Sequence, residues 1–176
     1  DLIAVSHALG ISGAVGIGHS LGGHTVTLAA ALQPGLFAAL LLLDPVILTR
    51  QSYVGANEIG QFAARRRSVW QSPEEMIERF RDRPPFHTWQ EAVLRDYAAY
   101  GLLPNAEGSY DLACPPEFEA ALYNLSTAAD IYPQIARVQV PVTVMRAAEP
   151  QDGDLLNFSA SPTAPDLAAQ FAHGHD

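Results

Sequence analysis

Short apolar runs separated by a helical pattern mark the first part of the chain. Residues 14–18 form an apolar run bounded by glycines, and residues 36–43 form a second one. Both have the length of a strand and carry no charge, which is typical of buried strands in a parallel sheet. The second run is rich in helix formers, but its shortness favours a strand. Between the runs, apolar residues recur at helical spacing from Leu21 to a Gln-Pro-Gly stop at 33–35. The order strand, helix, strand predicts a parallel unit with a right-handed crossover.

The middle of the chain has a different pattern. Charged residues, aromatic residues and prolines separate short helical patterns in this stretch. Ser72-Pro73-Glu74-Glu75 combines a capping residue, a proline at the first helical position and a glutamate three residues after the cap. Residues 88–91 repeat this signature before the next apolar stripe. These features predict an insertion made of helices.

A third apolar run, at residues 140–145, predicts a strand that returns to the sheet. A long loop follows it, and a last helix is expected from Pro165 to Phe171. We therefore predict an α/β fold in which strands near 14–18, 36–43 and 140–145 form a parallel sheet. The sheet belongs to an incomplete core made of residues 1–48 and 136–176, and residues 49–135 form an all-helical cap.

Composition and charge narrow the range of partners. The chain has 176 residues, 48% of them hydrophobic and 16% charged, with a net charge of −9. This charge excludes a broad basic surface for nucleic acid or an anionic membrane. The one basic run, Arg65–Arg67, is interpreted as a solvated helix face. No apolar segment is long enough to span a bilayer. The single cysteine, Cys114, forms no internal disulfide and lacks metal-ligand spacing, so we expect a cytoplasmic protein without a metal.

The segment GIGHSLGG, residues 16–23, carries the candidate chemistry. Gly18-His19-Ser20-Leu21-Gly22 matches G-x-S-x-G between a predicted strand and a predicted helix. A serine at the tip of such a sharp turn adopts a strained backbone, and side chains two residues before and after it would collide. We therefore interpret Ser20 as a nucleophile. The alternative is a glycine-rich turn in which the serine caps the helix.

Two neighbours of Ser20 have expected roles of their own. The backbone N–H of Leu21 lies at the start of the helix, where it could donate to a developing oxyanion. Gly23 would let the helix pack closely against the sheet. His19 is the variable residue of the turn. These residues, together with Gly18 and Gly22, complete the predicted nucleophile elbow.

At this point the chain resembles the α/β-hydrolase family, in particular members with a helical cap after the sixth strand. AVGIGHSLGGHTVTLAA resembles the family's fifth strand, nucleophile elbow and third helix, FAALLLLDPVI its sixth strand, and VPVTVMRAAEP its seventh. The resemblance covers residues 1–46 and 137–171. It implies a serine hydrolase that cleaves an ester, thioester, lactone or carbon–carbon bond of a small apolar substrate through a covalent intermediate. It implies no cofactor and no metal.

The resemblance also implies an acid that follows the serine in the chain and precedes the histidine. Glu149, Asp152 and Asp154 all lie in the loop after the third predicted strand, and we favour Asp152. Asp44, after the second predicted strand, is the alternative, because some members of the family place the acid there. An aspartate before a proline at a strand end also commonly fixes a turn.

The resemblance places the base, a histidine, beyond a further strand. His173 and His175 lie in the turn expected to lead into that strand. The other histidines are placed on the opening helix, on the elbow, one helical turn after Ser20, and in the cap: His7, His19, His24 and His87. We therefore expect a partial sequence that lacks the first strands, the second oxyanion donor and the last strand, and that is inactive by itself.

The alternative function is a non-catalytic, hydrolase-like binding or interaction module. A core of three parallel strands would expose a sheet edge and a large apolar face, which a partner would have to cover. The hydrolase interpretation instead expects a small-molecule substrate as the partner. The sequence leaves the oligomeric state open.

Overall fold

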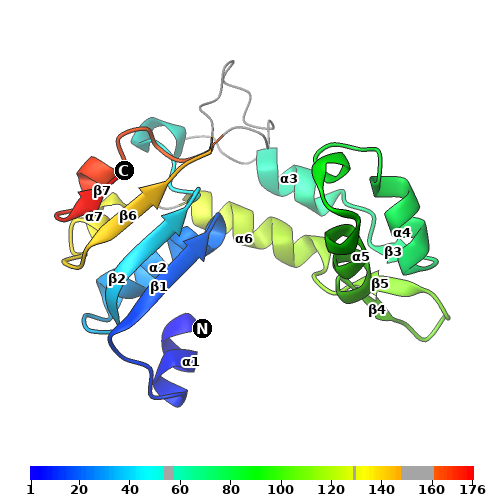
Figure 1. Cartoon of the computed structure of the whole chain (residues 1–176), viewed down its shortest axis with the longest axis horizontal. Coiled ribbons are helices and arrows are strands. Elements are labelled where there is room, and N and C mark those ends of the chain that lie inside the picture. The colour runs from blue at the N-terminus through cyan, green and yellow to red at the C-terminus, as the bar shows by residue number, and fades with distance from the viewer. Residues whose placement is uncertain (54–57, 129, 148–160) are drawn as a thin grey trace. The chain divides into compact units, whose positions relative to one another are not determined.

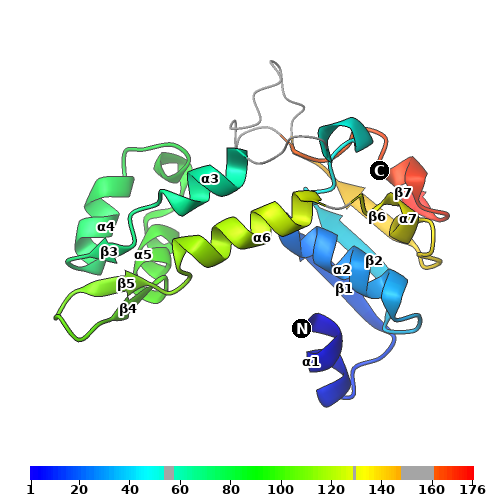
Figure 2. The same cartoon turned by 180° about the vertical axis from the view of Figure 1, so that it is seen from behind.

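The computed structural model describes residues 1–53, 58–128, 130–147 and 161–176. The chain divides into two compact units (Figures 1 and 2). The first, called here the core unit, contains residues 1–56 and 125–176. The second, called here the inserted unit, contains residues 57–124. Each has an apolar cluster of its own.

The core unit is built on a parallel sheet. Its elements are α1 (Leu2–Ala8), β1 (Ala14–His19), α2 (Leu21–Leu32), β2 (Phe37–Leu43), η1 (Arg50–Tyr53), α7 (Tyr132–Ile135), β6 (Val142–Met145), η3 (Ala168–Gln170) and β7 (Gly174–His175). Within the described residues the sheet order is β1-β2-β6-β7, and all neighbouring pairs are parallel. In the register, Gly18 lies opposite Leu42, which in turn lies opposite Val144. The predicted parallel α/β fold and its three strands are confirmed.

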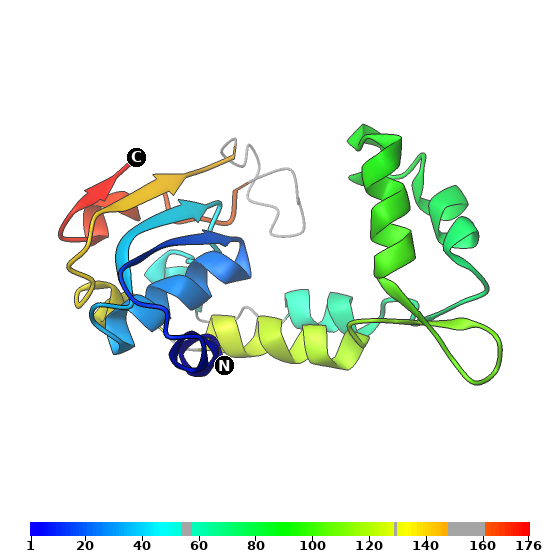
Figure 3. The same ribbon diagram turned by 60° about the horizontal axis from the view of Figure 1, so that its bottom comes forward.

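One face of the sheet carries the core. Leu40 and Leu42 of β2 and Val142 and Val144 of β6 are buried in one cluster with residues of α2 and α7. Figures 2 and 3 show α2 lying against the sheet on this face. Side chains alternate between the two faces of a strand. The neighbouring positions therefore point to the other face, where Val15 is 63% exposed, Ile17 61% and Met145 54%.

The end of the chain differs from the sequence prediction. The helix expected from Pro165 to Phe171 is a single 3-10 turn, η3, because Phe171 adopts an extended backbone and buries its side chain. Gly174 and His175 then pair in parallel with β6, where a turn was expected. A Cβ on Gly174 would lie 1.9 Å from the carbonyl oxygen of Ala168, so this close approach requires glycine.

The inserted unit mixes helices with a short sheet. Its elements are α3 (Glu58–Ala64), β3 (Val69–Trp70), α4 (Pro73–Phe80), η2 (Phe86–Thr88), α5 (Glu91–Tyr100), β4 (Leu102–Pro104), β5 (Tyr110–Leu112) and the first part of α6 (Pro116–Ala128). The short strands form an antiparallel sheet in the order β3-β5-β4. The expectation of an all-helical insertion is therefore wrong for these segments. Strands of two or three residues are too short to show an alternating pattern.

The turn between β4 and β5 stabilises this sheet. The Asn105 side-chain oxygen accepts hydrogen bonds from the backbone N–H groups of Glu107 and Ser109. Gly108 takes a positive φ of 76°, which glycine adopts without a steric penalty. The hairpin is thus encoded in its turn residues, not in the strands themselves.

The two predicted helix caps have different outcomes. Ser72 Oγ accepts a hydrogen bond of 3.2 Å from the Glu75 N–H, so the first cap is confirmed. The second is wrong, because Thr88 lies in η2 and its hydroxyl donates to the Pro85 carbonyl. Gln90 stands at the N-cap of α5 without a side-chain hydrogen bond.

Aromatic side chains form much of the inserted unit's core. Trp70 is 2% exposed and packs edge-on against Phe80, whose ring stacks on that of Phe86 at 4.4 Å. Trp89 and Tyr97 join the same group of rings. These aromatic side chains therefore pack against one another within the inserted unit.

Candidate active site

Ser20 stands between β1 and α2 in a strained backbone conformation. Its φ is 53° and its ψ is −123°, a region that residues with side chains rarely adopt. Neighbouring elements fix it there. The Ser20 N–H donates to the Leu43 carbonyl at 3.0 Å, and the Ser20 carbonyl accepts from the Gly23 and Val46 N–H groups, each at 3.0 Å. The Ser20 side chain makes no capping hydrogen bond to α2, so the alternative of a serine that caps the helix is not realised.

The glycines around Ser20 divide into two kinds. A Cβ on Gly18 would lie 2.5 Å from the Gly22 carbonyl oxygen, and one on Gly23 would lie 2.6 Å from the Pro45 Cβ. Both contacts are too close for any side chain, so these two glycines let β1, α2 and the end of β2 meet. A Cβ on Gly22 would meet no described atom within 4 Å. The steric requirement expected on both sides of Ser20 therefore holds for Gly18 only.

The N-terminus of α2 offers a backbone donor beside Ser20. Leu21 is the first residue of this helix, so its N–H has no acceptor one turn earlier within the helix. Among the described residues it donates to no other carbonyl either. The partial positive charge at the start of a helix strengthens such a donor toward an anion. The geometry suits the oxyanion role expected for Leu21.

Asp44 directly follows β2 and also has a positive φ, of 46°. Its N–H donates to the Met145 carbonyl at 2.7 Å. Its Oδ1 atom accepts hydrogen bonds from the Ala147 N–H, at 3.2 Å, and from the Ser161 hydroxyl. The carboxylate of Asp44 is thus engaged by residues on both sides of the segment 148–160.

The chain after this segment is held against the end of β2. The Thr163 hydroxyl donates to the Pro45 carbonyl at 2.7 Å, and the Ala164 N–H donates to the Ile47 carbonyl at 2.9 Å. Arg146 donates from its guanidinium to the Ala164 and Pro165 carbonyls and pairs with Asp176. The candidate acids Glu149, Asp152 and Asp154 lie outside the described residues.

The described histidines are not joined to Ser20. His19 is exposed on β1, and His175 is exposed on β7. His24 lies on α2, where burial lowers the pKa of its imidazole below the ordinary 6.5 and favours the neutral form. His7 is exposed on α1, His87 belongs to the inserted unit, and the backbone carbonyl of His173 accepts from Val142. None of these rings hydrogen-bonds the Ser20 hydroxyl within the described part of the chain.

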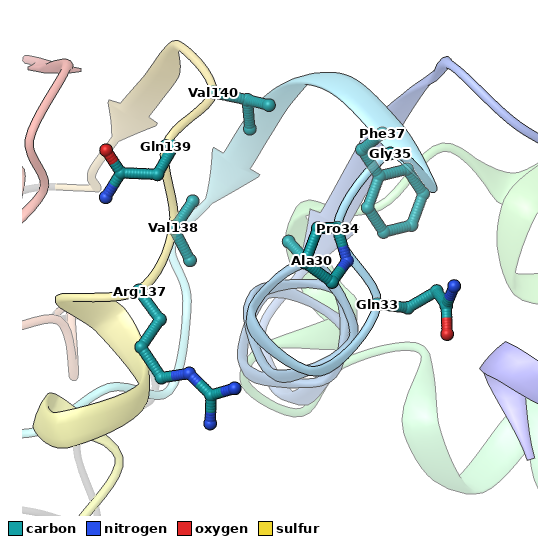
Figure 4. Close-up of a pocket in the computed structure, with 9 residues that line it drawn as sticks. All are labelled: Ala30, Gln33, Pro34, Gly35, Phe37, Arg137, Val138, Gln139 and Val140. Carbon is teal, nitrogen blue, oxygen red and sulfur yellow. The ribbon is translucent and has the colours of Figure 1, made fainter.

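A pocket of about 150 Å³ opens at the amino ends of β2 and β6, the end of the sheet opposite Ser20 (Figure 4). Residues at the end of α2 and the start of β2 line it, together with the segment before β6 that includes Arg137 and Val138. In open α/β sheets ligands bind at the carboxyl ends of the strands, where Ser20 and Asp44 lie. The pocket therefore does not belong to the candidate site.

Other features bear on cofactors and membranes. The described residues contain no cluster of histidine, cysteine or acidic side chains that could hold a metal ion. Among the helices that the structure describes, none has the length and apolarity needed to cross a bilayer.

Sequence reasoning missed Ser161 and Arg146. The signal for Ser161 is weak, since a Ser-Pro-Thr segment in a long loop is also an ordinary turn sequence. Arg146 carries a clearer signal, because it is the single arginine or lysine in the stretch after the third apolar run.

Comparison with known proteins places this geometry in a family. A family model described as "Alpha/beta hydrolase family" matches residues 1–175. Solved structures with the same fold include an E-2-(acetamidomethylene)succinate hydrolase, with a TM-score of 0.69 and 20% identity over 97% of this chain and 58% of that one. A thioesterase domain from the curacin biosynthetic pathway has a TM-score of 0.60 and 16% identity, covering 96% of this chain and 58% of that one.

Curated relatives match shorter parts of the chain. The type I acyl-CoA thioesterase mpaH of Penicillium roqueforti is 34% identical over 122 residues, which is 66% of this chain and 26% of that protein. The abhydrolase domain-containing protein AKT2 of Alternaria alternata is 31% identical over 80 residues, 46% of this chain and 30% of that protein. The matches thus span less than a third of the length of these relatives.

Proposed function

Because the chain belongs to the alpha/beta hydrolase family, we propose that it carries the nucleophile of a serine hydrolase and that Ser20 is this nucleophile. One observation supports the proposal most directly. Ser20 holds a strained backbone at a strand-to-helix turn while its hydroxyl caps nothing. A serine with a structural role would use its hydroxyl to cap the helix, and glycine would take this backbone without strain.

The proposed reaction has two halves. The Ser20 hydroxyl attacks the carbonyl carbon of the substrate and loses its proton to a general base, while the Leu21 N–H donates to the oxyanion that forms. The tetrahedral intermediate collapses and expels the leaving group, which takes up the proton. Water then attacks the acyl-enzyme by the same route, releases the acid product and restores the hydroxyl.

The remaining members of the triad are assigned by proposal. We assign the acid to Asp152, which follows β6 in the sequence, and the base to a histidine that is not one of the six in this chain. The role of the acid is to hold the histidine in the correct tautomer and to stabilise its charged form. On this assignment the 176-residue chain alone gives no turnover. Turnover by this chain that Ser20→Ala abolishes would contradict it.

We propose an ester or thioester of a small apolar acid as the substrate. The relative from Penicillium roqueforti named above is a type I acyl-CoA thioesterase. We also propose a cytoplasmic location, based on the single cysteine.

The test is covalent labelling of the full-length protein that carries these residues. A fluorophosphonate probe should label the wild-type protein on the peptide that contains Ser20, and Ser20→Ala should abolish the label. Ser12→Ala is the matched control, because Ser12 is an exposed serine just before the same strand. Hydrolysis of acyl-CoA thioesters and p-nitrophenyl esters of increasing chain length then ranks the substrates.

Two results would count against the proposal. Labelling that survives Ser20→Ala places the nucleophile elsewhere. A folded protein that neither labels nor hydrolyses any of these substrates favours a binding module instead, whose partner would cover the exposed face at Val15 and Ile17.

A further inference from the structure

Residues 45–48, which follow the end of β2, form an irregular segment that is buried in the core unit. Val46 is 8% exposed, Ile47 0% and Leu48 4%. Irregular segments usually run over the surface, because buried backbone polar groups need hydrogen-bond partners. The groups that supply these partners therefore determine how firmly the 45–48 segment is held.

Two side-chain hydroxyls supply partners to carbonyl groups of this segment. The Thr163 hydroxyl donates to the Pro45 carbonyl at 2.7 Å, and the Tyr132 hydroxyl donates to the Leu48 carbonyl at 2.9 Å. Both hydrogen bonds are buried. They join the segment to two parts of the chain that lie more than 80 positions later in the sequence, since the separations are 118 and 84 positions.

The segment in turn contacts the nucleophile elbow. The Val46 N–H donates to the Ser20 carbonyl at 3.0 Å. Pro45 lies so close to the start of α2 that a Cβ on Gly23 would be 2.6 Å from the Pro45 Cβ. Because Val46 directly follows Pro45, a shift of the segment would change both contacts and would be transmitted to the backbone of Ser20.

We propose that Thr163 and Tyr132 are positioning residues, whose hydroxyls hold the 45–48 segment and through it the backbone of Ser20. Neither residue touches the reacting atoms in this role. The inference rests on the proposed function, because it gives the two hydroxyls a purpose in a reaction at Ser20. A mispositioning of about 1 Å can reduce the rate of an enzyme about 100-fold.

Both hydroxyls are themselves fixed by their surroundings. Tyr132 is 5% exposed and Thr163 6%. The Arg50 guanidinium lies 4.5 Å from the centre of the Tyr132 ring, and the Tyr132 N–H donates to the Asp130 carboxylate at 2.9 Å. Burial raises the pKa of the Tyr132 phenol above its ordinary value, so the hydroxyl keeps the proton that it donates. The Thr163 N–H donates to the Ser161 Oγ at 3.2 Å.

A residue needed only to fill the core at these two places would not require an oxygen. Phenylalanine provides the same ring as tyrosine, and valine has nearly the volume of threonine. Tyr132→Phe and Thr163→Val therefore remove a hydroxyl, keep the packing and leave a buried carbonyl without its side-chain donor. A purely structural hydrogen bond changes the amount of folded protein, whereas a positioning role also changes kcat of the folded molecules.

The experiment measures kcat and KM of the full-length variants for p-nitrophenyl ester hydrolysis, well below their unfolding temperatures. We expect Thr163→Val to lower kcat about 10-fold and Tyr132→Phe about threefold, with KM within about twofold of wild type. The order follows from distance along the chain, because the Thr163 bond lies directly before Val46 and the Tyr132 bond lies two residues after it. Thr163→Ser keeps the hydroxyl and should keep kcat within about twofold of wild type.

Thr27→Val is the matched control. Thr27 is also a buried threonine of the core unit, and its hydroxyl donates to the Gly23 carbonyl at 2.8 Å. This carbonyl lies within α2, where the Thr27 N–H is its partner one helical turn later. The substitution therefore removes a buried hydroxyl without leaving a carbonyl unpaired, and kcat should stay at the wild-type value.

A second measurement does not depend on turnover. Hydrogen exchange followed by mass spectrometry should be faster across residues 45–48 in Thr163→Val and Tyr132→Phe, and unchanged in Thr163→Ser and Thr27→Val. Fluorophosphonate labelling of Ser20 in the wild-type protein tests the proposed function by itself. Failure of that labelling counts against the proposed function, whereas the comparison of variants with wild type tests the two hydroxyls.

Two outcomes would overturn the inference. Wild-type kcat in Thr163→Val, together with a lower unfolding temperature, would show that its hydroxyl only stabilises the fold. An unchanged kcat with a raised KM would show that the hydroxyls affect substrate binding and not the position of Ser20. If Thr163→Val does not fold, the comparison of Tyr132→Phe with Thr27→Val gives the same two tests.

Discussion

Two non-glycine residues among those described, Ser20 and Asp44, have a positive φ, and both lie at the carboxyl ends of neighbouring strands. Ser20 is bonded to the residues directly before and two after Asp44, so the two strained positions share one hydrogen-bonded neighbourhood. Strain of this kind persists only when the surrounding structure imposes it. The strained backbone of Ser20 and Asp44 therefore lowers the stability of the chain, while the surrounding hydrogen bonds fix the backbone at the candidate site.

The strain at Ser20 predicts that activity and stability can be separated. Ser20→Gly should raise the free energy of unfolding by about 1 kcal/mol, because glycine takes a φ of 53° without a Cβ penalty. Ser20→Ala keeps the Cβ and should leave this free energy near the wild-type value. Both variants should lose the fluorophosphonate label. Chemical denaturation of the purified variants measures the change.

Ser12→Gly is the matched control for this measurement. Unlike Ser20, Ser12 does not have a positive φ, so glycine relieves no strain there. It should destabilise the protein slightly or leave it unchanged, because glycine adds freedom to the unfolded chain. A Ser20→Gly variant that is less stable than Ser20→Ala would show that Ser20 is not strained.

The sequence predicts the residues at this site unequally, for a physical reason. Ser20, Leu21 and Gly18 lie within four positions of one another, so local spacing reveals them. The hydrogen bond between Asp44 and Ser161 joins residues 117 positions apart, and no local pattern encodes it. The sequence therefore identified the elbow, whereas the structure was needed to find what holds Asp44.

At the scale of elements, packing at the elbow depends on two close approaches between β1, α2 and the end of β2. Gly18 meets the backbone of α2, and Gly23 meets Pro45. Helix α2 can lie this close to the sheet only because neither residue has a side chain. Gly22 makes no such close approach, because a Cβ at this position would point into open space.

This difference predicts opposite effects from two identical substitutions. Gly18→Ala should lower the free energy of unfolding by about 1–3 kcal/mol, because its Cβ would meet a backbone carbonyl at 2.5 Å that has no room to move. Gly22→Ala should leave it unchanged or raise it by up to about 1 kcal/mol, because alanine is the better helix former. Thermal unfolding of the two variants beside wild type measures the difference, and equal destabilisation by both would show that Gly18 and Gly22 are packed alike.

The elements were predictable where their patterns were long. The strands β1, β2 and β6 correspond to apolar runs, and β1, α2 and β2 follow one another at the expected positions. The strands β3, β4 and β5 have two or three residues each and left no periodic signal. Their pairing depends on a turn at Asn105 and on contacts within the inserted unit, which the pattern of single residues does not show.

At the scale of the whole molecule, the two apolar clusters share no residue. One contains the sheet residues of the core unit, and the other contains Trp70, Met76, Leu94 and their neighbours in the inserted unit. A domain's stability derives mainly from its own buried apolar surface. The two units should therefore respond separately to substitutions in their cores.

Trp70→Ala tests this separation. Loss of this buried ring, which packs against Phe80 and under the Arg67 guanidinium, should destabilise the inserted unit by about 3–5 kcal/mol. Hydrogen exchange should rise across residues 69–112 and stay unchanged across 14–43. Trp89→Ala is the control, because Trp89 is 37% exposed and should cost less. Equal acceleration in both regions would show that the chain unfolds as one cooperative unit.

The order of strands in the sheet has a consequence for how the chain folds and how it can change. β1 and β2 are joined by a single helix, so they can pair early, whereas β6 reaches β2 only after the whole inserted unit has been passed. Such a pairing has high contact order and is expected to form late. The entropy of closing a loop grows only with the logarithm of its length, about 0.6 kcal/mol for each doubling. The connection between β2 and β6 is therefore a place where evolution can lengthen, shorten or replace sequence at little thermodynamic cost while the strand register beside Ser20 is kept.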